Sequence, residues 1–327
     1  MLPLQTKVQI PQPGFFINYE QVVSLFGSCF SDHIGEKLLR YKFKACPNPF
    51  GVLYNPASII NALTLLTHKE AFTENNLQHR NDLWFSFLHH TSFSHPDKLS
   101  CLERINTRFA TAKSQFEQSE IIILTLGTAF IYRLKSTGQV VANCHKIPDS
   151  EFTREFLSPE QIAELMSHEI GRLNLSKPGI RFIFTVSPIR HWKDGAIENQ
   201  RSKASLVLAI RLLERAHENC YYFPTYEIFM DELRDYRFYA SDMLHPSDFA
   251  VDYIWEAFTH TFFDTPTQQL MKKVQKITKS YQHRSFNKNT PAHKSFVEKL
   301  IEETDKLCEL HSYLDFSTEK HNLLNNF

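Results

Sequence analysis

The stretch VVSLFGSCFSDHIGEKL, residues 22–38, joins an apolar run to a helix-like pattern through a single glycine. The run at 22–27 predicts a buried strand, and Gly27 permits a sharp turn at its end. Apolar residues then recur at helical spacing, so we expect Ser28 and Cys29 at or just before a helix N-terminus. Ligands bind at the carboxyl ends of strands in open parallel sheets, so these two nucleophilic side chains lie where a site would form.

The same alternation of strand-like and helix-like segments continues along the chain. Further strands are predicted near 120–126, 180–186 and 220–223, with a weaker one near 42–46. Helices are predicted to begin at Asn55-Pro56, at the Ser158 cap before Pro159, and near 199. This order of elements predicts an α/β fold with a mainly parallel sheet flanked by helices.

The chain changes character at Asp264. The residues that follow are rich in Lys, Gln and Asn, carry few strand signals, and include the amphipathic segment HKSFVEKLIEETDKL at 293–307. We therefore expect two parts, an α/β domain at 1–263 and a C-terminal helical extension at 264–327 that serves as an appendage or a lid.

Composition narrows the class of protein. The 327 residues include 36 basic and 36 acidic side chains, so the net charge gives no reason to expect nucleic acid or an anionic membrane as partner. The N-terminus has no basic start followed by an apolar run, and no segment approaches the ~20 apolar residues that span a bilayer. A soluble cytoplasmic protein is expected.

The sequence gives no sign of a metal or cofactor site. Its six cysteines are scattered without a C-x-x-C pair, which favours neither a zinc site nor a disulfide framework. His191, Asp242 and His245 could contribute to a metal site, but no H-x-H or H-E-x-x-H spacing supports one. We expect no bound metal and no cofactor.

A candidate partner for the nucleophile lies in YASDMLHPSDFAVDYIW, residues 239–255. Asp242 and His245 are three residues apart in a predicted loop, ahead of a helix capped by Ser247. This spacing lets the carboxylate orient the imidazole, which could then take a proton from Ser28 or Cys29. Alone, an Asp-x-x-His loop usually caps a helix.

The ordered motifs resemble a known family. The segments FGSCFSDHIGEKL, NPFGVLYNP, LTLGTAFIY, NCHKIP, TVSPIRH, YFPTYEI and SDMLHPSDFAVDYIW resemble the GSCFA family, itself similar to the SGNH or GDSL hydrolases. The match covers most of residues 15–263. It implies a three-layer α/β/α fold with an acyl-ester hydrolase site at the strand ends, in which Asp242 and His245 match the Asp-x-x-His motif.

The resemblance leaves the nucleophile open between two residues. An ungapped match of Gly27-Ser28-Cys29 to the Gly-Asp-Ser of SGNH hydrolases makes Cys29 the nucleophile, and a shift of one residue would make it Ser28. We prefer Cys29, because a helix N-terminus is expected to lower the pKa of a thiol and thiols ionise more readily than hydroxyls. The alternative interpretation makes Cys29 a packed structural thiol and Ser28 a helix cap.

Acyl transfer also needs donors for the developing oxyanion. The resemblance implies the N–H of the nucleophile and that of Gly51, but the family's third donor, an asparagine, is missing from Gly127-Thr128-Ala129-Phe130. Asn55 and Asn143 are candidate substitutes, although asparagines more commonly stabilise turns.

Further candidates come from two histidine-containing segments. His145 and Lys146 could recognise an anionic substrate or simply belong to a solvated loop. His89 and His90 alternate with aromatic residues in a strand-like manner, so one of them, with His90 the candidate, could point into the site. Three aromatic residues are expected in the core: Trp192, Phe223 and Phe229.

Two classes of function follow. The first is an enzyme, a hydrolase or acyltransferase acting on a small-molecule ester, a thioester or an acetylated carbohydrate through an acyl-cysteine or acyl-serine. The second is a catalytically lapsed SGNH-like binding module that keeps the pocket without the chemistry. The sequence leaves the substrate and the oligomeric state open.

Overall fold

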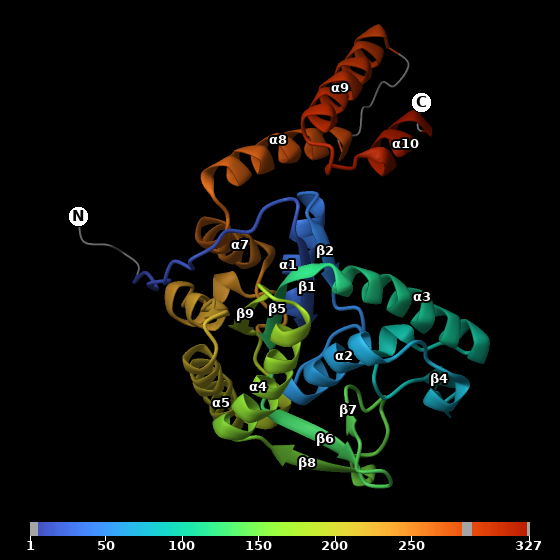
Figure 1. The fold of residues 1–327 in the computed structure, drawn as a ribbon, viewed down its shortest axis with the longest axis vertical. Helices are drawn as coiled ribbons and strands as arrows, with labels where there is room; N and C mark the ends of the chain where they lie inside the picture. Colours follow the sequence, from blue (N-terminus) through green and yellow to red (C-terminus); the bar gives the residue numbers. More distant parts are fainter. Residues whose placement is uncertain (1–5, 283–289, 326–327) are drawn as a thin grey trace.

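The computed structural model describes residues 6–282 and 290–325, and a parallel sheet of five strands forms its centre (Figure 1). The strand order is β10-β9-β5-β1-β2. The strands are β1 (Val22–Gly27), β2 (Lys44–Pro47), β5 (Ser119–Leu126), β9 (Arg181–Val186) and β10 (Cys220–Tyr222). Nearly every residue of β1, β5 and β9 is buried, as expected for strands covered on both faces.

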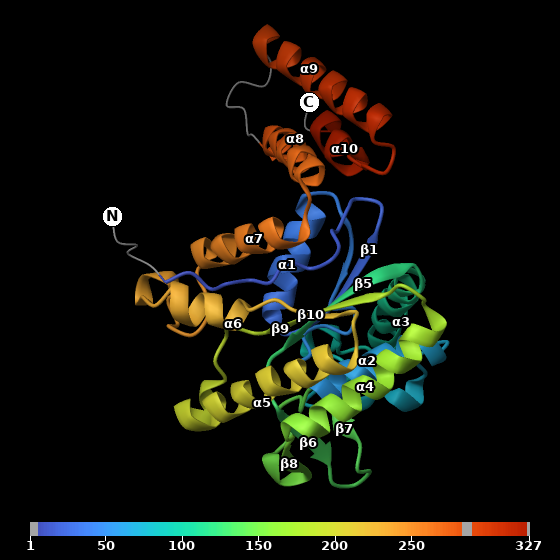
Figure 2. The same cartoon turned by 60° about the vertical axis from the view of Figure 1, so that its left-hand side comes forward.

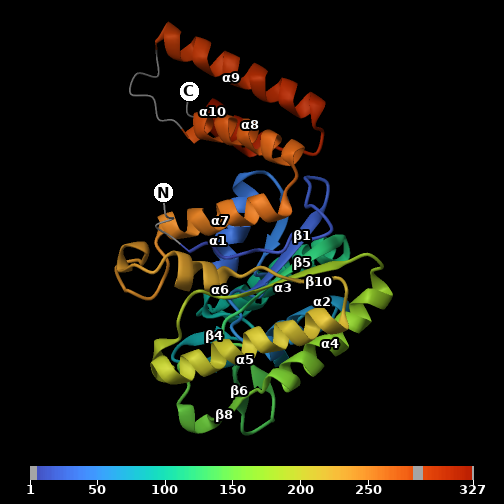
Figure 3. The same ribbon diagram turned by 90° about the vertical axis from the view of Figure 1, so that its left-hand side faces the viewer.

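Helices cover both faces of this sheet, which makes three layers (Figures 2 and 3). One face packs against α2 (Pro56–His68), α3 (Lys98–Glu117), α4 (Pro159–Ser176) and α5 (Gly195–Ala216). The other packs against α1 (Cys29–Arg40) and α7 (Asp248–Phe262). The short α6 (Thr225–Glu227) contributes Tyr226 to the first cluster. The predicted parallel α/β sheet flanked by helices is confirmed.

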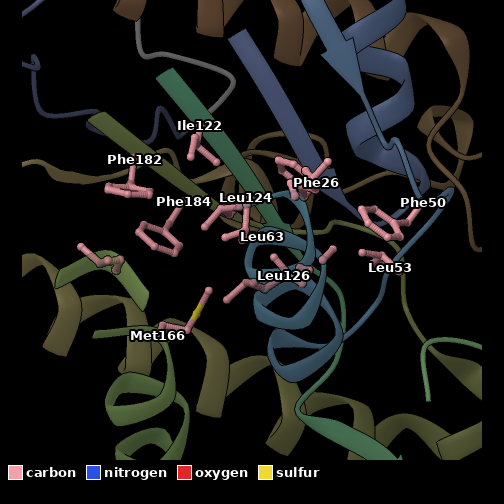
Figure 4. Close-up of a cluster of buried hydrophobic side chains, with 14 of the residues drawn as sticks. Phe26, Phe50, Leu53, Leu63, Ile122, Leu124, Leu126, Met166, Phe182 and Phe184 are labelled. Carbon is pink, nitrogen blue, oxygen red and sulfur yellow. The ribbon is translucent and has the colours of Figure 1, made fainter. Parts of the chain in front are cut away.

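Alternation along the strands divides the core between the two faces. Phe182 and Phe184 of β9 point to the same side as Leu124 of β5 and approach Met166 of α4 (Figure 4). Ile183 lies between the two phenylalanines in sequence and belongs to the opposite cluster. Because successive side chains of a strand face opposite ways, each strand contributes to both cores.

Two small antiparallel units were not predicted. A hairpin joins β3 (Gln78–Arg80) to β4 (Leu83–Phe85), and a three-stranded sheet contains β6 (Phe130–Leu134), β7 (Val140–Val141) and β8 (Phe152–Phe156). The three-stranded sheet lies between β5 and α4 in the chain, and we call residues 127–158 the insert. Its strands are short and carry partly exposed side chains, so they lack the continuous apolar run that marks a buried strand.

The C-terminal part is helical, with α8 (Thr265–Gln282), α9 (Pro291–Leu310) and α10 (Ser317–Asn325). The predicted boundary at 263/264 falls between α7 and α8. Phe316 is buried in the core cluster that also holds Phe43, so these helices pack on the α/β body. They lie at the opposite end of the molecule from the insert, as an appendage remote from its strands (Figure 1).

The turn after β1 depends on Gly27. Its φ is +146°, and a Cβ at this position would stand 2.2 Å from the carbonyl oxygen of Thr125 in β5. The Gly27 N–H donates to Asn48 Oδ1 at 2.8 Å, and Asn48 Nδ2 donates to Asp32 Oδ1 at 2.7 Å. These contacts hold the start of α1, and therefore Cys29, at the carboxyl end of the sheet.

Within residues 6–282 and 290–325, no helix combines the length and the apolar character needed to cross a membrane.

Candidate active site

A cleft of about 590 Å³ opens at the carboxyl ends of the central strands. Cys29 after β1, Arg190 and His191 after β9, and His245 before α7 reach it from the α/β body. The insert contributes a facing wall that includes Phe130, Tyr132, Val141, Asn143, Cys144 and Arg154. The cleft therefore lies between the sheet and the insert.

Cys29 and Ser28 occupy different environments although they are neighbours in sequence. Cys29 is half-buried and lines the cleft, whereas Ser28 is 1% exposed and does not. Ser28 stands at the N-cap position of α1, but its side chain accepts no capping hydrogen bond. Its Oγ is buried without a partner within the described part of the chain. Access to the cleft therefore favours Cys29 over Ser28.

The pKa of Cys29 is raised above its ordinary value of 9.0, contrary to the lowering that we expected from the helix N-terminus. Burial is the main cause, and the charge of Asp32 adds to it. The backbone N–H groups of Cys29 and Phe30 and the cation of Lys203 act in the opposite direction, but more weakly. Desolvation of the thiolate thus outweighs the first turn of α1.

Asp242 and His245 form a hydrogen-bonded pair, with Oδ2 and Nδ1 2.5 Å apart. Asp242 Oδ1 also accepts the N–H groups of Leu244 and His245, both at 2.9 Å. These bonds and the imidazole lower the pKa of Asp242 to about 2, so it is a carboxylate at neutral pH. His245 lines the same cleft as Cys29, but no hydrogen bond within the described residues joins the imidazole to Cys29 or Ser28.

The candidate oxyanion donors are partly committed elsewhere. The Gly51 N–H donates to Asn48 O at 2.8 Å, and Gly51 is not among the residues that line the cleft. Asn55 lines the cleft while its Oδ1 caps α2 by accepting the Ser58 N–H at 2.8 Å. Asn143 also lines the cleft, and its Oδ1 accepts the N–H of His145. Asn55 thus caps a helix, Asn143 stabilises a turn, and both also line the cleft.

The other predicted binding residues do not line the cleft. His145 stacks on Phe85, and its Nε2 is 2.9 Å from Ser86 O, which fixes the ring in a structural position. Lys146 is exposed, and His90 contacts its own turn through Ser92. These three residues lie outside the set that lines the cleft.

His89 and His90 do not form the strand that their pattern suggested, because β4 ends at Phe85. Of the two histidines, His89 is the one that points inward, and it points into the hydrophobic core and not into the cleft. It stacks on Phe50 with ring centroids 5.0 Å apart and is 1% exposed. Burial, with a smaller effect of His145, lowers the pKa of His89 to about 3.

Lys203 is a buried cation beneath the cleft that we did not anticipate. Its residue is 0% exposed, and its Nζ donates to Gly127 O at 2.8 Å and to Ser187 O at 2.7 Å. These carbonyls follow β5 and β9, so Lys203 ties the two strand ends together. Burial lowers the pKa of Lys203 to about 7, opposed by Cys29 and reinforced by Arg190.

The sequence contains a weak signal for Lys203. It shares a helical face with Leu206 and Ile210, both of which are buried in the core. A lysine on an apolar stripe of this kind is unusual, but its two carbonyl partners are remote in sequence.

His191 also lines the cleft, a position that the sequence did not predict, since its pattern suggested only a possible metal ligand. Its Nε2 would be 3.2 Å from a Cβ on Gly127, and its ring meets Tyr54 edge-on with centroids 5.3 Å apart. Burial lowers the pKa of His191 to about 4, with further contributions from Lys203 and His245. His191 is therefore a neutral imidazole at neutral pH.

Trp192 also lines the cleft and is 52% exposed, so its expected place in the core was wrong. Phe223 and Phe229 are buried as predicted. Trp192 follows β9 in a short turn at the cleft mouth, where the sequence carries no apolar periodicity to bury it.

The cysteines and acidic residues give no metal centre in the described ranges 6–282 and 290–325, where no cluster of three or more suitable side chains occurs. All six cysteines are free thiols. Cys144 is the other cysteine that lines the cleft, and burial raises its pKa to about 11.

Comparison with known proteins identifies two family matches along the chain. Residues 22–258 match the GSCFA family, and residues 274–326 match the GSCFA domain protein, C-terminal domain. Comparison with curated proteins and with solved structures gave no match. The first match spans more than half of the chain and includes Cys29, Asp242 and His245, and the protein therefore belongs to the GSCFA family.

Proposed function

We propose that the protein is an acyl-ester hydrolase or acyltransferase in which Cys29 is the nucleophile, His245 the proton acceptor and Asp242 the residue that orients the imidazole. The observation that carries this proposal is that Cys29 lines the cleft together with a preformed His245–Asp242 pair, while Ser28 does not. The resemblance to SGNH hydrolases in the nucleophile turn and the Asp-x-x-His motif supports the same roles.

The proposed reaction begins with loss of the Cys29 proton to His245, directly or through one water. A base is needed because burial raises the pKa of this thiol and keeps it protonated at neutral pH. The thiolate attacks the carbonyl carbon of the substrate, an S–C bond forms, and the bond to the leaving group breaks. His245 returns the proton to the leaving group, and water or a second alcohol then releases the acyl group from sulfur.

Two features would stabilise charge during this reaction. The N–H groups of Cys29 and Phe30, at the start of α1, lower the pKa of the thiol, and they are the candidate donors to an oxyanion formed beside the sulfur. Asn55 Nδ2 is the candidate third donor, because Asn55 lines the cleft and its Oδ1 already caps α2. The Gly51 N–H is bonded to Asn48 O and therefore does not serve as a donor to the oxyanion.

The alternative is a lapsed binding module. Two observations favour it. Within the described residues no hydrogen bond joins His245 to the Cys29 thiol, and the pKa of that thiol is raised. A binding module would keep the cleft without nucleophilic turnover.

The deciding experiment combines Cys29→Ala, Ser28→Ala and His245→Ala with two assays. The first is hydrolysis of p-nitrophenyl acetate, and the second is the rate of iodoacetamide labelling at each cysteine, read by peptide mass spectrometry. We expect Cys29→Ala to abolish hydrolysis, Ser28→Ala to retain most of it, and His245→Ala to slow both hydrolysis and labelling of Cys29 near neutral pH.

Cys144 provides an internal control, because it lines the same cleft and its pKa is raised to about 11. Cys144→Ala should leave hydrolysis unchanged, and Cys29 should be labelled faster than Cys144. Hydrolysis that survives in Cys29→Ala and disappears in Ser28→Ala would assign the nucleophile to Ser28. Equal labelling of Cys29 with and without His245, with no hydrolysis, would favour the binding module.

A further inference from the structure

Arg190 lies in the cleft without an acidic partner. It follows β9 and lines the cleft, and no carboxylate of the described residues forms an ion pair with it. Its Nε is buried and has no hydrogen-bond partner within residues 6–282 and 290–325. The guanidinium has a side-chain hydrogen bond with Tyr226, but its Nε–H loses water without gaining a partner among the described residues, and an unpaired buried donor is costly.

Lys203 is a second cation without a carboxylate beside it. Its ammonium is bonded only to main-chain carbonyl oxygens in the described structure, those of Gly127 and Ser187. Arg190 contributes to lowering the pKa of Lys203, which shows that the two positive charges lie close enough to repel one another. The group below Arg190 therefore supplies no negative charge to pair with the guanidinium.

The carboxylates of the cleft are already paired with other groups. Asp194 forms an ion pair with Arg154, and Asp149 lies 3.6 Å from the Nζ of Lys193. Asp242 holds His245. These three acids of residues 6–282 and 290–325 are thus paired with other bases, which leaves Arg190 able to bind an anion of a ligand.

We propose that Arg190 binds an anionic group of the substrate, a carboxylate or a phosphate. A guanidinium donates two parallel hydrogen bonds to either group, and this bidentate geometry is stronger than a single contact. Trp192 closes one side of the position, with its ring centroid 5.9 Å from the Arg190 guanidinium carbon. This inference rests on the proposed function, because it concerns the substrate that Cys29 attacks.

The sheet topology indicates where the anionic group lies relative to the scissile bond. Arg190 follows β9 and Cys29 follows β1, and β5 lies between these strands. Neighbouring strands are about 4.8 Å apart, so the two strand ends are separated by roughly 10 Å. Because both residues line one cleft, we expect a single substrate to carry the anionic group and the ester carbonyl several bonds apart, as in a monoester of a dicarboxylic acid or in an acyl ester of a phosphorylated alcohol.

The test measures protection of Cys29 from iodoacetamide, which does not require turnover. Labelling of Cys29 is followed at constant ionic strength with succinate, with inorganic phosphate, and with succinamide as the neutral analogue of succinate. We expect succinate or phosphate to slow labelling and succinamide to have no effect. The anion that protects at the lower concentration identifies the preferred group.

Variants assign the effect to one residue. Arg190→Gln should raise the anion concentration for half protection at least about tenfold, the effect of losing a charged hydrogen-bond partner. Arg190→Lys keeps the positive charge and should retain part of the protection. It also keeps the test decisive if Arg190→Gln does not fold. Arg201→Gln is the matched control, because Arg201 is exposed on α5 and paired with Glu198 outside the cleft.

The proposal is overturned if neither anion protects better than succinamide, or if folded Arg190→Gln and Arg190→Lys are protected like the native protein. Protection without any ester hydrolysis would leave the anion site standing and refute the proposed activity. Hydrolysis that depends on Cys29, without protection by either anion, would do the reverse.

Discussion

Replacing Lys203 by methionine is expected to remove a pH dependence of stability between about pH 7 and pH 10. In the folded protein the pKa of Lys203 is lowered from 10.5 to about 7, because its ammonium is buried. In this range the unfolded chain binds a proton that the folded protein has released. The free energy of unfolding of the native protein should therefore rise with pH.

The size of the effect follows from the same shift. One proton contributes at most about 1.4 kcal/mol per pH unit, so lowering the pKa from 10.5 to about 7 corresponds to a maximum of roughly 5 kcal/mol. Methionine cannot donate to Gly127 O and Ser187 O, and each unpaired carbonyl costs about 1–3 kcal/mol. The native protein should thus exceed the variant most clearly near pH 10, and the difference should shrink toward pH 7.

Urea unfolding followed by circular dichroism at several pH values between 7 and 10 measures this difference. Lys135→Met is the matched control, since Lys135 is exposed on the surface of the insert. The control should keep the native slope, because it leaves Lys203 and its bonds to Gly127 O and Ser187 O intact. Parallel curves for the native protein and Lys203→Met across this range would refute the assignment of Lys203 as a buried lysine with a lowered pKa.

Other substitutions test the turn and the core. Gly27→Ala should lower the free energy of unfolding by at least about 2 kcal/mol in urea unfolding, because a Cβ would stand 2.2 Å from Thr125 O. Gly171→Ala, in a helix with nothing within 4 Å, should be neutral or stabilising, and equal effects at the two glycines would contradict the steric argument. His89→Phe should reduce the loss of stability on acidification from pH 6.5 to 3. The pKa of His89 is lowered to about 3 in the folded protein, so the unfolded chain takes up the proton first. An unchanged acid transition would show that His89 does not cause this loss. Asn48→Ala removes two hydrogen bonds at the turn before Cys29 and should lower the free energy of unfolding by about 2 kcal/mol. It should also change the rate at which iodoacetamide labels Cys29, and an unaltered rate would show that Asn48 does not position the thiol.

The central sheet could be predicted because its strands are buried on both faces. The runs at 22–27, 120–126 and 180–186 are almost wholly apolar, and they correspond to β1, β5 and β9. The strands of the insert were missed for the opposite reason. β6 has partly exposed side chains, β8 has exposed polar side chains, and β7 has only two residues, so no local pattern separates them from loops.

The site could be predicted only where its signals are local. Cys29 follows a glycine turn, and His245 is three residues from Asp242, so a short window contains each feature. Lys203 and Arg190 depend on what surrounds them in space, which no window reports. The direction of the Cys29 pKa was wrong because the helix N-terminus is visible in sequence, whereas the larger effect, burial, is not.

The insert enters and leaves the α/β body at neighbouring places, after Leu126 and before Pro159. Its strands pair only with one another in the described structure, so none of them sets the register of the five parallel strands. Exchange of this segment should therefore leave the turn that carries Cys29 and the loop that carries His245 in place. Transplanting residues 128–158 from another GSCFA protein should replace the wall that faces Cys29, while Gly127 with its bond to Lys203, the proposed nucleophile and the proposed anion site at Arg190 stay on the α/β body.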